Sequence, residues 1–325
     1  MIIRPKKYIQ ILCISFSLVL GLRLIVSALA DPFADFYYLT GWHLGHFHSV
    51  ENLTERKVKR RLLKDRPVID IAIFGNSRAA ALNPDNSDFA QIGSRALNLS
   101  FAGASLSEIQ QLLDLSLKKH PRMRPVVVVD YDSCFHPIMP DKPGLFISEQ
   151  RDQDALKDLM ARMLALRTLG DWARALIANT QLHQTILDNG AVLRSNSDTD
   201  RQARTLRDLP VMEFVFSQPY KTACLDRIRA IHDRAQNSIF VVNPISPTMV
   251  RIMAKYGAEQ HLEEWRKNLE ALVPVIDFSC IDKWHDSDFV DAHHYNQATA
   301  ELIMSKIALF LTGKETNSAC PNTHF

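Results

Sequence analysis

Short runs of apolar and β-branched residues recur along the chain from residue 67 onward. They lie at 68–74, 96–100, 126–129, 238–242 and 273–278. Runs of this length and composition are typical of parallel strands buried on both faces. Helical segments stand between most of them. The pattern therefore predicts an α/β fold, a three-layer α/β/α sandwich with a central parallel sheet.

Two of the predicted helices have clear start signals. Ser105 and Glu108 have the spacing of a capping box, and apolar residues follow them at helical spacing. Asn296 is a good N-cap residue for a closing helix over 297–311. Two further helices are expected, near 220–235 and 258–272.

The hydrophobic pattern divides the chain into three parts. Residues 1–30 are predominantly apolar, 31–66 form a connector, and 67–325 hold the alternating strands and helices. Between about 138 and 218 the alternation stops and charge-rich helical segments take its place, which we interpret as a helical insertion. The basic residues between 56 and 66 are interpreted as the solvated face of a helix.

The first part has the pattern of a membrane anchor. From Tyr8 to Ala30 the only charged residue is Arg23, and basic residues precede this stretch. The stretch is long enough to cross a bilayer, and the basic residues are expected to stay in the cytoplasm. We expect a single transmembrane helix in the inner (cytoplasmic) membrane, with the body on the periplasmic side. Cleavage after 28–30, as in a signal peptide, is the alternative.

Charge and cysteine content narrow the function classes. A net charge of +2 over 325 residues gives no reason to expect a nucleic-acid partner. The cysteines have neither CxxC nor zinc-ribbon spacing, so no structural metal and no cofactor is expected. In an oxidising compartment one or two disulfides can form among the last four, and free buried thiols are the alternative. The last four cysteines are Cys134, Cys224, Cys280 and Cys320.

Polar residues follow several predicted strands, at the edge of a parallel sheet where ligands bind. Ser77 lies in a Gly-Asn-Ser turn after the first strand, where its hydroxyl and its N–H can both face a reacting carbonyl. A serine hydroxyl needs a general base, and the base needs a group that fixes its tautomer. Asp291 and His294, before the last helix, can form that pair. The pattern predicts a serine-esterase type of site.

The order of these blocks resembles the SGNH/GDSL hydrolase superfamily. The resemblance covers about residues 67–312 outside the insertion, and it rests on Gly-Asn-Ser after the first strand, Gly103 after the second, and Asp-x-x-His before the last helix. It implies that Ser77 is the nucleophile and that Asp291 and His294 are its base pair. It also implies an oxyanion hole formed by the N–H groups of Ser77 and Gly103.

The third block departs from the family pattern. The family has Gly-x-Asn-Asp there, and this chain has Asp-Tyr-Asp-Ser at 130–133, without the asparagine that completes the oxyanion hole. An ionised Asp132 facing an oxyanion would repel it, so Asp132 must point away, be protonated, or take another role such as substrate binding. Asn243, after the fourth strand, is a candidate replacement donor, and Asn98 is another.

Two further residues are candidates for substrate binding. Arg78 follows the nucleophile and can attract an anionic polymer or acyl donor; a solvent-exposed helix residue is the alternative. His293 can contact substrate, or act as the base if the loop is shifted by one residue. Although acidic residues and histidines cluster between 285 and 294, we expect no metal there.

The anchor and the motifs together look like bacterial SGNH proteins of cell-surface polymers, such as those of alginate O-acetylation and teichoic-acid D-alanylation. The resemblance implies an ester hydrolase or O-acyltransferase that acts on an acylated extracytoplasmic glycan or polymer. A membrane-bound O-acyltransferase is a candidate partner. The alternatives are a non-catalytic accessory that binds a polysaccharide or such a partner, and a lipase-like esterase acting on membrane lipids.

Overall fold

The computed structural model describes most of the chain. It covers residues 5–30, 37, 47–48, 52–92, 95–135, 184–194, 198–280 and 283–314. Much of the predicted connector, and residues 136–183 of the predicted insertion, lie outside the described residues.

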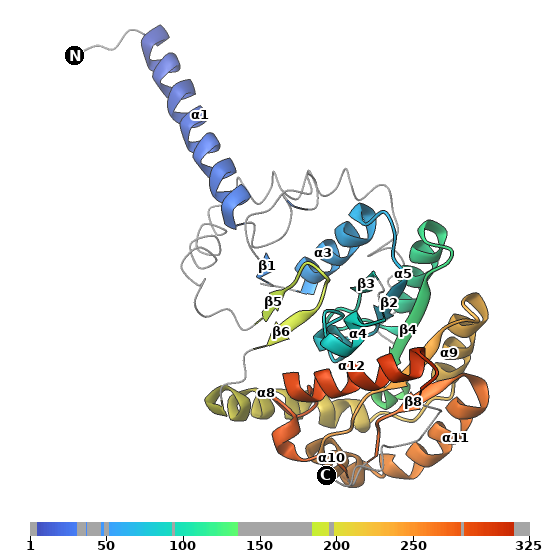
Figure 1. Cartoon of the computed structure of the whole chain (residues 1–325). Helices are drawn as coiled ribbons and strands as arrows, with labels where there is room; N and C mark the ends of the chain where they lie inside the picture. The colour runs from blue at the N-terminus through green and yellow to red at the C-terminus, as the bar shows by residue number, and fades with distance from the viewer. Residues whose placement is uncertain are drawn as a thin grey trace.

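The body is built on a five-stranded parallel sheet (Figure 1). In spatial order its strands are β3 (Ala96–Asn98), β2 (Ile71–Phe74), β4 (Arg124–Val129), β7 (Ile239–Val242) and β8 (Val275–Asp277). Four of them lie in runs of residues that the sequence predicts as strands, and β4 begins two residues before its predicted run, so the α/β class is confirmed. The order reverses between β2 and β4, and in open parallel sheets ligands bind at the carboxyl ends of strands beside such a reversal.

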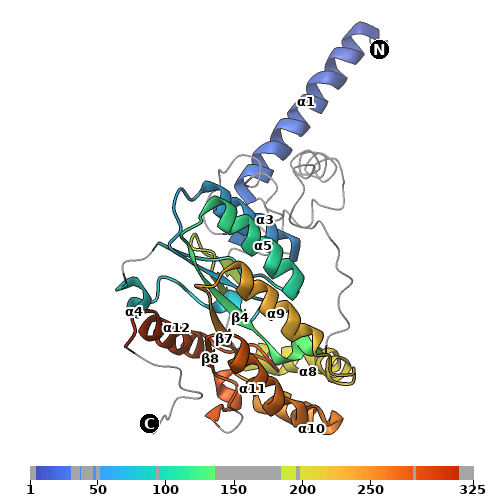
Figure 2. The same cartoon turned by 90° about the vertical axis from the view of Figure 1, so that its right-hand side faces the viewer.

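Helices pack on both faces of the sheet because alternate strand residues point to opposite sides. On one face the strands meet α3 (Asn52–Asp65), α5 (Leu106–Lys119), α9 (Ala223–Arg234), α10 (Pro247–Tyr256) and α11 (Leu262–Leu272). On the other they meet α4 (Ser87–Ala90) and α12 (Gln297–Leu311). Figure 2 shows α5 and α9 on the face of the sheet away from α12.

The predicted helix starts are confirmed. The Ser105 side chain accepts a hydrogen bond from the Glu108 N–H at 3.2 Å, and the Glu108 carboxylate accepts one from the Ser105 N–H at 3.1 Å. Asn296 accepts one from the Thr299 N–H at 2.9 Å. Each cap satisfies amide groups that the first helical turn leaves without partners.

The interpretation of the basic helix as solvated is wrong for the side of α3 that faces the body. Lys59 is fully buried, and its ammonium donates to the carbonyl of Asn98 at 2.9 Å and to that of Gly190. Arg56 forms an ion pair of 3.2 Å with Glu108. These long cationic side chains stabilise backbone and carboxylate oxygens of the neighbouring elements, a role that charge patterning alone does not reveal.

The predicted helical insertion also contains a β-hairpin. Strand β5 (Gln184–Ile186) pairs antiparallel with β6 (Val192–Arg194) and with β1 (Phe47–His48). Strands of two or three residues are too short to show an alternating pattern in the sequence. Helix α8 (Asp198–Phe216) then returns the chain to the main body, with its buried residues in the same core as α9 and α10.

A helix, α1 (Pro5–Ala30), occupies the segment predicted as a membrane anchor. In the part of the chain that the structure describes, no helix combines the length and apolarity needed to cross a membrane.

One disulfide joins two described cysteines. Cys134, at the end of the 3-10 helix η2 (Tyr131–Cys134), is bonded to Cys224 in the first turn of α9, 90 residues further along. Cys280 is also disulfide-bonded, and Cys13 is free and exposed on α1. The Cys134–Cys224 bond ties the carboxyl end of β4 to the amino end of α9.

Candidate active site

The structure brings Ser77, His294 and Asp291 together. Ser77 follows β2, and the other two lie in the loop between the 3-10 helix η6 (Asp286–Asp288) and α12. His294 Nε2 is 2.8 Å from Ser77 Oγ, and His294 Nδ1 is 2.8 Å from Asp291 Oδ2. These are hydrogen-bond distances. A nucleophile, a base and a carboxylate that orients the base are thus connected in series.

Asp291 fixes the loop as well as the imidazole. Its Oδ1 accepts the backbone N–H groups of His293 at 3.0 Å and His294 at 2.7 Å. Burial alone would raise the pKa of Asp291, but the charge of His294 and its hydrogen bond hold that pKa well below the usual range. Asp291 is therefore ionised and holds His294 Nδ1 in its protonated form, which leaves Nε2 to accept the serine proton.

The turn at Ser77 is tight. The predicted helix after it is only a 3-10 helix, η1 (Ala79–Ala81). Asn76 Oδ1 accepts the Arg78 N–H at 2.9 Å, and the Asn76 amide donates to Asp130. A Cβ at Gly75 would meet Ala79 Cβ at 2.5 Å, so only glycine allows this close approach. Asn76 and Gly75 together place Ser77 at the edge of the sheet.

Gly103 lies in the turn between β3 and α5, on the wall of the same cavity as Ser77. Its φ of +67° is a left-handed conformation that favours glycine. Its N–H makes no hydrogen bond within the described residues. Such a group is available to a developing oxyanion, which is the role that the resemblance to the SGNH superfamily predicts for Gly103.

Arg78 is buried, with 3% of its surface exposed, so the alternative of a solvent-exposed helix residue is wrong. Its Nε lies 3.2 Å from Asp130 Oδ1, and its Nη2 lies 2.5 Å from Asp132 Oδ1. Burial alone would lower the pKa of Arg78, but the two carboxylates raise it, so the guanidinium stays charged. Arg78 and Asp132 compensate each other's charge, and both line the cavity beside Ser77, so their roles in substrate binding stay predictions.

The two asparagines considered as replacement oxyanion donors are engaged elsewhere. Asn243 is buried, and its amide donates to Asp130 Oδ1 at 2.7 Å. The Asn98 amide donates to the carbonyls of Ala79 at 2.8 Å and Leu82 at 2.7 Å. Neither residue lines the cavity at Ser77. Both predictions are therefore wrong, because buried amide groups at strand ends first satisfy their protein neighbours.

A cavity of about 220 Å³ opens beside Ser77. One wall carries apolar side chains of α8, and another carries the disulfide and the amino ends of α5 and α9. The lining includes Ser77, Arg78, Gly103, Ser107, Asp132, Cys134, Val211, Met212, Val215, Lys221, Cys224, Arg227 and His293. The sequence did not indicate Val211, Met212, Val215, Lys221 or Arg227 as lining residues, because only the folded chain brings them to the strand ends.

His293 lies beside the triad without belonging to it. Its ring centroid is 3.9 Å from that of His294, with the two ring planes tilted by 40°, and its Nδ1 is 3.7 Å from Asp291 Oδ1. Because His294 and not His293 contacts Ser77, the alternative of a loop shifted by one residue is wrong. Burial, with the charge of His294, lowers the pKa of His293 to about 3, so its ring is neutral near pH 7.

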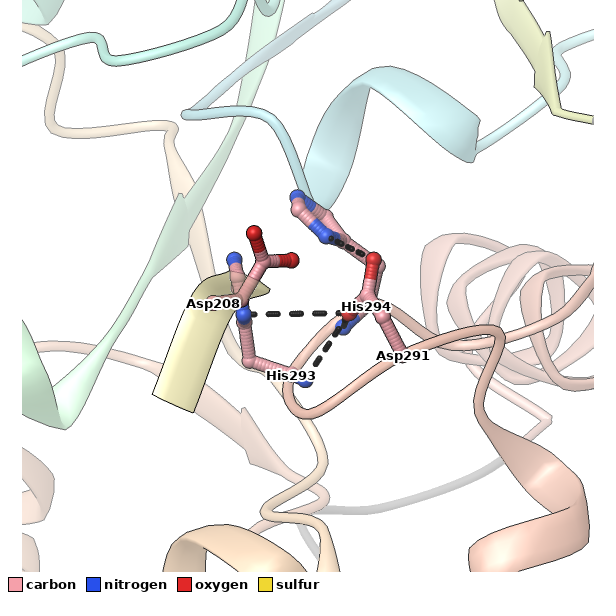
Figure 3. A group of neighbouring side chains, drawn as sticks. All are labelled: Asp208, Asp291, His293 and His294. Carbon is pink, nitrogen blue, oxygen red and sulfur yellow. Dashed lines mark hydrogen bonds and ion pairs between the residues drawn. The ribbon is translucent and has the colours of Figure 1, made fainter. Parts of the chain in front are cut away.

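Asp208 is a neighbour of the site that the sequence did not reveal. It comes from α8 and lies beside the loop of His293 and His294 (Figure 3). Ligand atoms of Asp208, Asp291, His293 and His294 lie within 4.8 Å of one another, so these residues are the ones able to hold a metal ion among those described. His294 and Asp291 are already hydrogen-bonded to each other. A metal ion bound by either residue would disrupt the hydrogen-bonded series that joins them to Ser77.

The arrangement can pass a proton from Ser77 Oγ to His294 while an electrophile binds in the cavity. Neither a protein-family model nor a curated protein matches this sequence.

Proposed function

We propose that the chain is a serine-dependent ester hydrolase or O-acyltransferase with a three-layer fold and site of the SGNH type. The observation that carries this proposal is the continuous hydrogen-bonded series from Ser77 through His294 to Asp291, at the mouth of a cavity large enough for a small acyl group. A structural role would not require the nucleophile to line a cavity.

The reaction has two halves. Ser77 Oγ attacks the ester carbonyl while His294 Nε2 takes the hydroxyl proton, and the resulting imidazolium is stabilised by Asp291. The tetrahedral intermediate collapses when His294 returns the proton to the leaving alcohol oxygen, which gives an acyl-serine. Water or an acceptor hydroxyl then attacks that ester, with His294 again as base, and Ser77 is regenerated.

Negative charge on the carbonyl oxygen needs hydrogen-bond donors in place before the reaction. The N–H groups of Ser77 and Gly103 are the proposed donors, since both residues line the cavity. Asn76 is an asparagine that lines this cavity, but its amide donates to Asp130, and the third block at 130–133 has no asparagine to match the donor of the SGNH pattern. A hole of two donors predicts slower acyl transfer than a hole of three, by about 10²-fold for one missing donor.

The location and the natural substrate follow from the resemblance alone and form part of the proposal. We propose an extracytoplasmic acylated glycan or cell-surface polymer as the substrate, with a membrane-bound O-acyltransferase as a candidate partner. Whether water or a sugar hydroxyl accepts the acyl group is decided by what fills the cavity after the first half-reaction.

The test is turnover of 4-nitrophenyl acetate by the full-length chain. Ser77→Ala and His294→Ala are each expected to reduce kcat by at least about 10³-fold, because they act as a unit. Ser217→Ala, at an exposed serine that does not line the cavity, is the matched control and should leave kcat unchanged. If the wild type neither turns over the ester nor reacts at Ser77 with a fluorophosphonate, the proposal fails and a binding protein becomes the better interpretation.

A further inference from the structure

Both chain neighbours of Ser77 are bound to one buried carboxylate, that of Asp130. The Asn76 amide donates to Asp130 Oδ2, and Arg78 Nε lies 3.2 Å from Asp130 Oδ1. Asn76 Oδ1 also accepts the Arg78 N–H at 2.9 Å, so the Asn76 side chain spans the turn. Only 3% of the Asp130 surface is exposed. The proposed nucleophile therefore lies between two residues that share one anchoring group.

Asp130 also connects three neighbouring strand ends. It follows β4, the turn of Ser77 follows β2, and Asn243 follows β7. The Asn243 amide donates to Asp130 Oδ1 at 2.7 Å. Strands β2, β4 and β7 are adjacent in the middle of the sheet. The contacts of Asp130 thus attach the Ser77 turn to the centre of the sheet as well as to its own strand.

The donors around Asp130 require a group that only accepts hydrogen bonds. A carboxylate has two acceptor oxygens and no donor, whereas an amide in its place would turn its own N–H groups toward a neighbouring amide. Because the Arg78 N–H engages Asn76 Oδ1, the Asn76 amide nitrogen is the atom that faces Asp130. Burial of a charge is unfavourable unless donors compensate it, and here two amides and a guanidinium do so. The carboxylate therefore determines which way the Asn76 side chain points.

The helical segment after Ser77 is short. The 3-10 helix η1 has three residues, and its N-cap residue Arg78 makes no side-chain cap hydrogen bond. A regular α-helix fixes its first turn through a ladder of backbone hydrogen bonds, and three residues of 3-10 helix provide little of that ladder. Contacts with other elements must supply the rest, and Asp130 receives such contacts from both sides of Ser77.

We infer that Asp130 is a positioning residue for the nucleophile: its carboxylate fixes Asn76 and Arg78, and these place Ser77 Oγ 2.8 Å from His294 Nε2. This inference rests on the proposed function of Ser77. Asp130 acts through its neighbours and not on the ester itself. Because a displacement of about 1 Å at a reacting group can reduce the rate about 10²-fold, loss of this anchor should lower kcat far more than it changes KM.

The experiment exchanges the two partners of one hydrogen bond. In Asp130→Asn two amide nitrogens face each other, and in Asn76→Asp two carboxylates do. The double exchange, Asp130→Asn with Asn76→Asp, restores an amide–carboxylate pair and keeps an acceptor for the Arg78 N–H. With 4-nitrophenyl acetate and the full-length chain, each single variant should lose about 10²-fold in kcat with KM within about threefold of wild type, and the double exchange should recover at least about tenfold of that loss.

Asp277→Asn is the matched control for a purely structural role. Asp277 is also 3% exposed, at the end of the edge strand β8. It accepts Arg266 Nε at 2.5 Å and the Ser279 N–H at 2.7 Å. This variant should lower the urea midpoint and leave kcat unchanged. Single variants at Asp130 and Asn76 with the kcat of wild type, or a double exchange no faster than they are, would overturn the inference and leave the proposed function intact.

A second measurement does not depend on ester turnover. Ser77→Cys, in a chain that also carries Cys13→Ser, places a thiol beside His294, and the thiolate that the imidazole stabilises is the form that iodoacetamide alkylates. Asp130→Asn should slow this alkylation near pH 7 by about tenfold, as mass spectrometry of the peptide measures, and the double exchange should restore it. If Asp130→Asn does not fold, Asn76→Ala, at a partly exposed position, replaces it with the same expected loss. Equal alkylation rates with and without the anchor overturn the inference whatever the catalytic result.

Discussion

Asp291 carries two tasks in one side chain. One carboxylate oxygen orients His294 at 2.8 Å, and the other accepts two backbone N–H groups of its own loop. The Asp-x-x-His pair was recognisable in the sequence because its two residues are only three apart. At that separation the carboxylate can contact both the imidazole and the backbone of the same loop. Ser77, the partner of His294, lies 217 residues before it in the sequence. Its position was predictable only through the order of blocks along a parallel sheet.

Asp291→Asn is expected to reduce kcat strongly while the fold persists. An amide can still contact the loop, but it favours the wrong tautomer of His294 and does not stabilise its charged form. We expect a loss of about 10⁴-fold in kcat, as the corresponding substitution causes in a well-studied serine triad. The measurement is kcat on 4-nitrophenyl acetate, with Asp286→Asn, at an exposed carboxylate before the loop, as control. A loss below tenfold would argue against His294 as the base.

Arg78 and Asp132 show where residue-level reasoning reached its limit. Both are adjacent to catalytic blocks, so the sequence suggested contact with substrate. In the fold the buried guanidinium lies between Asp130 and Asp132, and burial raises the pKa of Asp130 to about 6 even though Arg78 opposes the shift. Which charges compensate one another depends on distances between strand ends, and the sequence does not contain these distances.

Asp132→Asn is expected to lower stability without improving catalysis. The variant restores an amide in the third block but removes one of the two charges that compensate Arg78. We expect the free energy of unfolding to fall by about 1–3 kcal/mol, the value of a hydrogen bond to a charged group. Urea denaturation measures it, and Asp114→Asn, in an exposed pair with Arg234, should change stability by less than about 0.5 kcal/mol. A tenfold rise in kcat would instead mean that Asp132 faces the oxyanion.

At the scale of helices and strands, features that depend on residues close in sequence were predicted correctly. Features that depend on residues far apart in sequence were not. The caps at Ser105 and Asn296 were predictable because their hydrogen bonds lie within one helical turn. Strand positions were predictable because burial on both faces requires continuous apolar runs. Helix α3 was misjudged because its buried lysine binds carbonyls of β3 and of the β5–β6 turn, which are distant in sequence.

Lys59 makes stability depend on pH. Burial lowers its pKa from 10.5 to about 7, although Glu55 opposes the shift. Between pH 7 and about 10 the unfolded chain therefore holds a proton on Lys59 that the folded chain has largely lost. Folding releases this proton, so the contribution of Lys59 to stability rises with pH in this window, by up to about 1.4 kcal/mol per pH unit, and is least favourable below pH 7.

The check is the urea midpoint of wild type and Lys59→Met at pH 7, 8 and 9. The wild type should gain stability relative to the variant as pH rises. Lys64→Met, at an exposed position of the same helix, should follow the wild type at each pH. Parallel pH profiles for wild type and Lys59→Met would show that Lys59 keeps an ordinary pKa in the fold.

At the scale of the molecule, the insertion is the part that the sequence described least. Its helix α8 returns to the sheet edge and supplies Val211, Met212 and Val215 to the cavity and Asp208 to the neighbourhood of the triad. The SGNH pattern lies outside this insertion, so the resemblance contains no information about that wall. The groups proposed to be catalytic were therefore predictable, whereas most of the side chains that line the rest of the cavity were not.

The Cys134–Cys224 bond joins the catalytic frame to this cavity wall. It closes a loop of 90 residues that contains the whole insertion, and both cysteines line the cavity. Replacing both cysteines by serine should lower the free energy of unfolding by about 2–4 kcal/mol, because the unfolded chain regains the conformations that the cross-link excludes. Since both cysteines line the cavity, KM for an ester should rise more than kcat falls. Denaturation and kinetics of the double variant measure both effects, with Cys13→Ser as the matched control because that cysteine is free and exposed. An unchanged unfolding midpoint would mean that the packing of α9 against β4, without the disulfide, sets the position of the cavity wall.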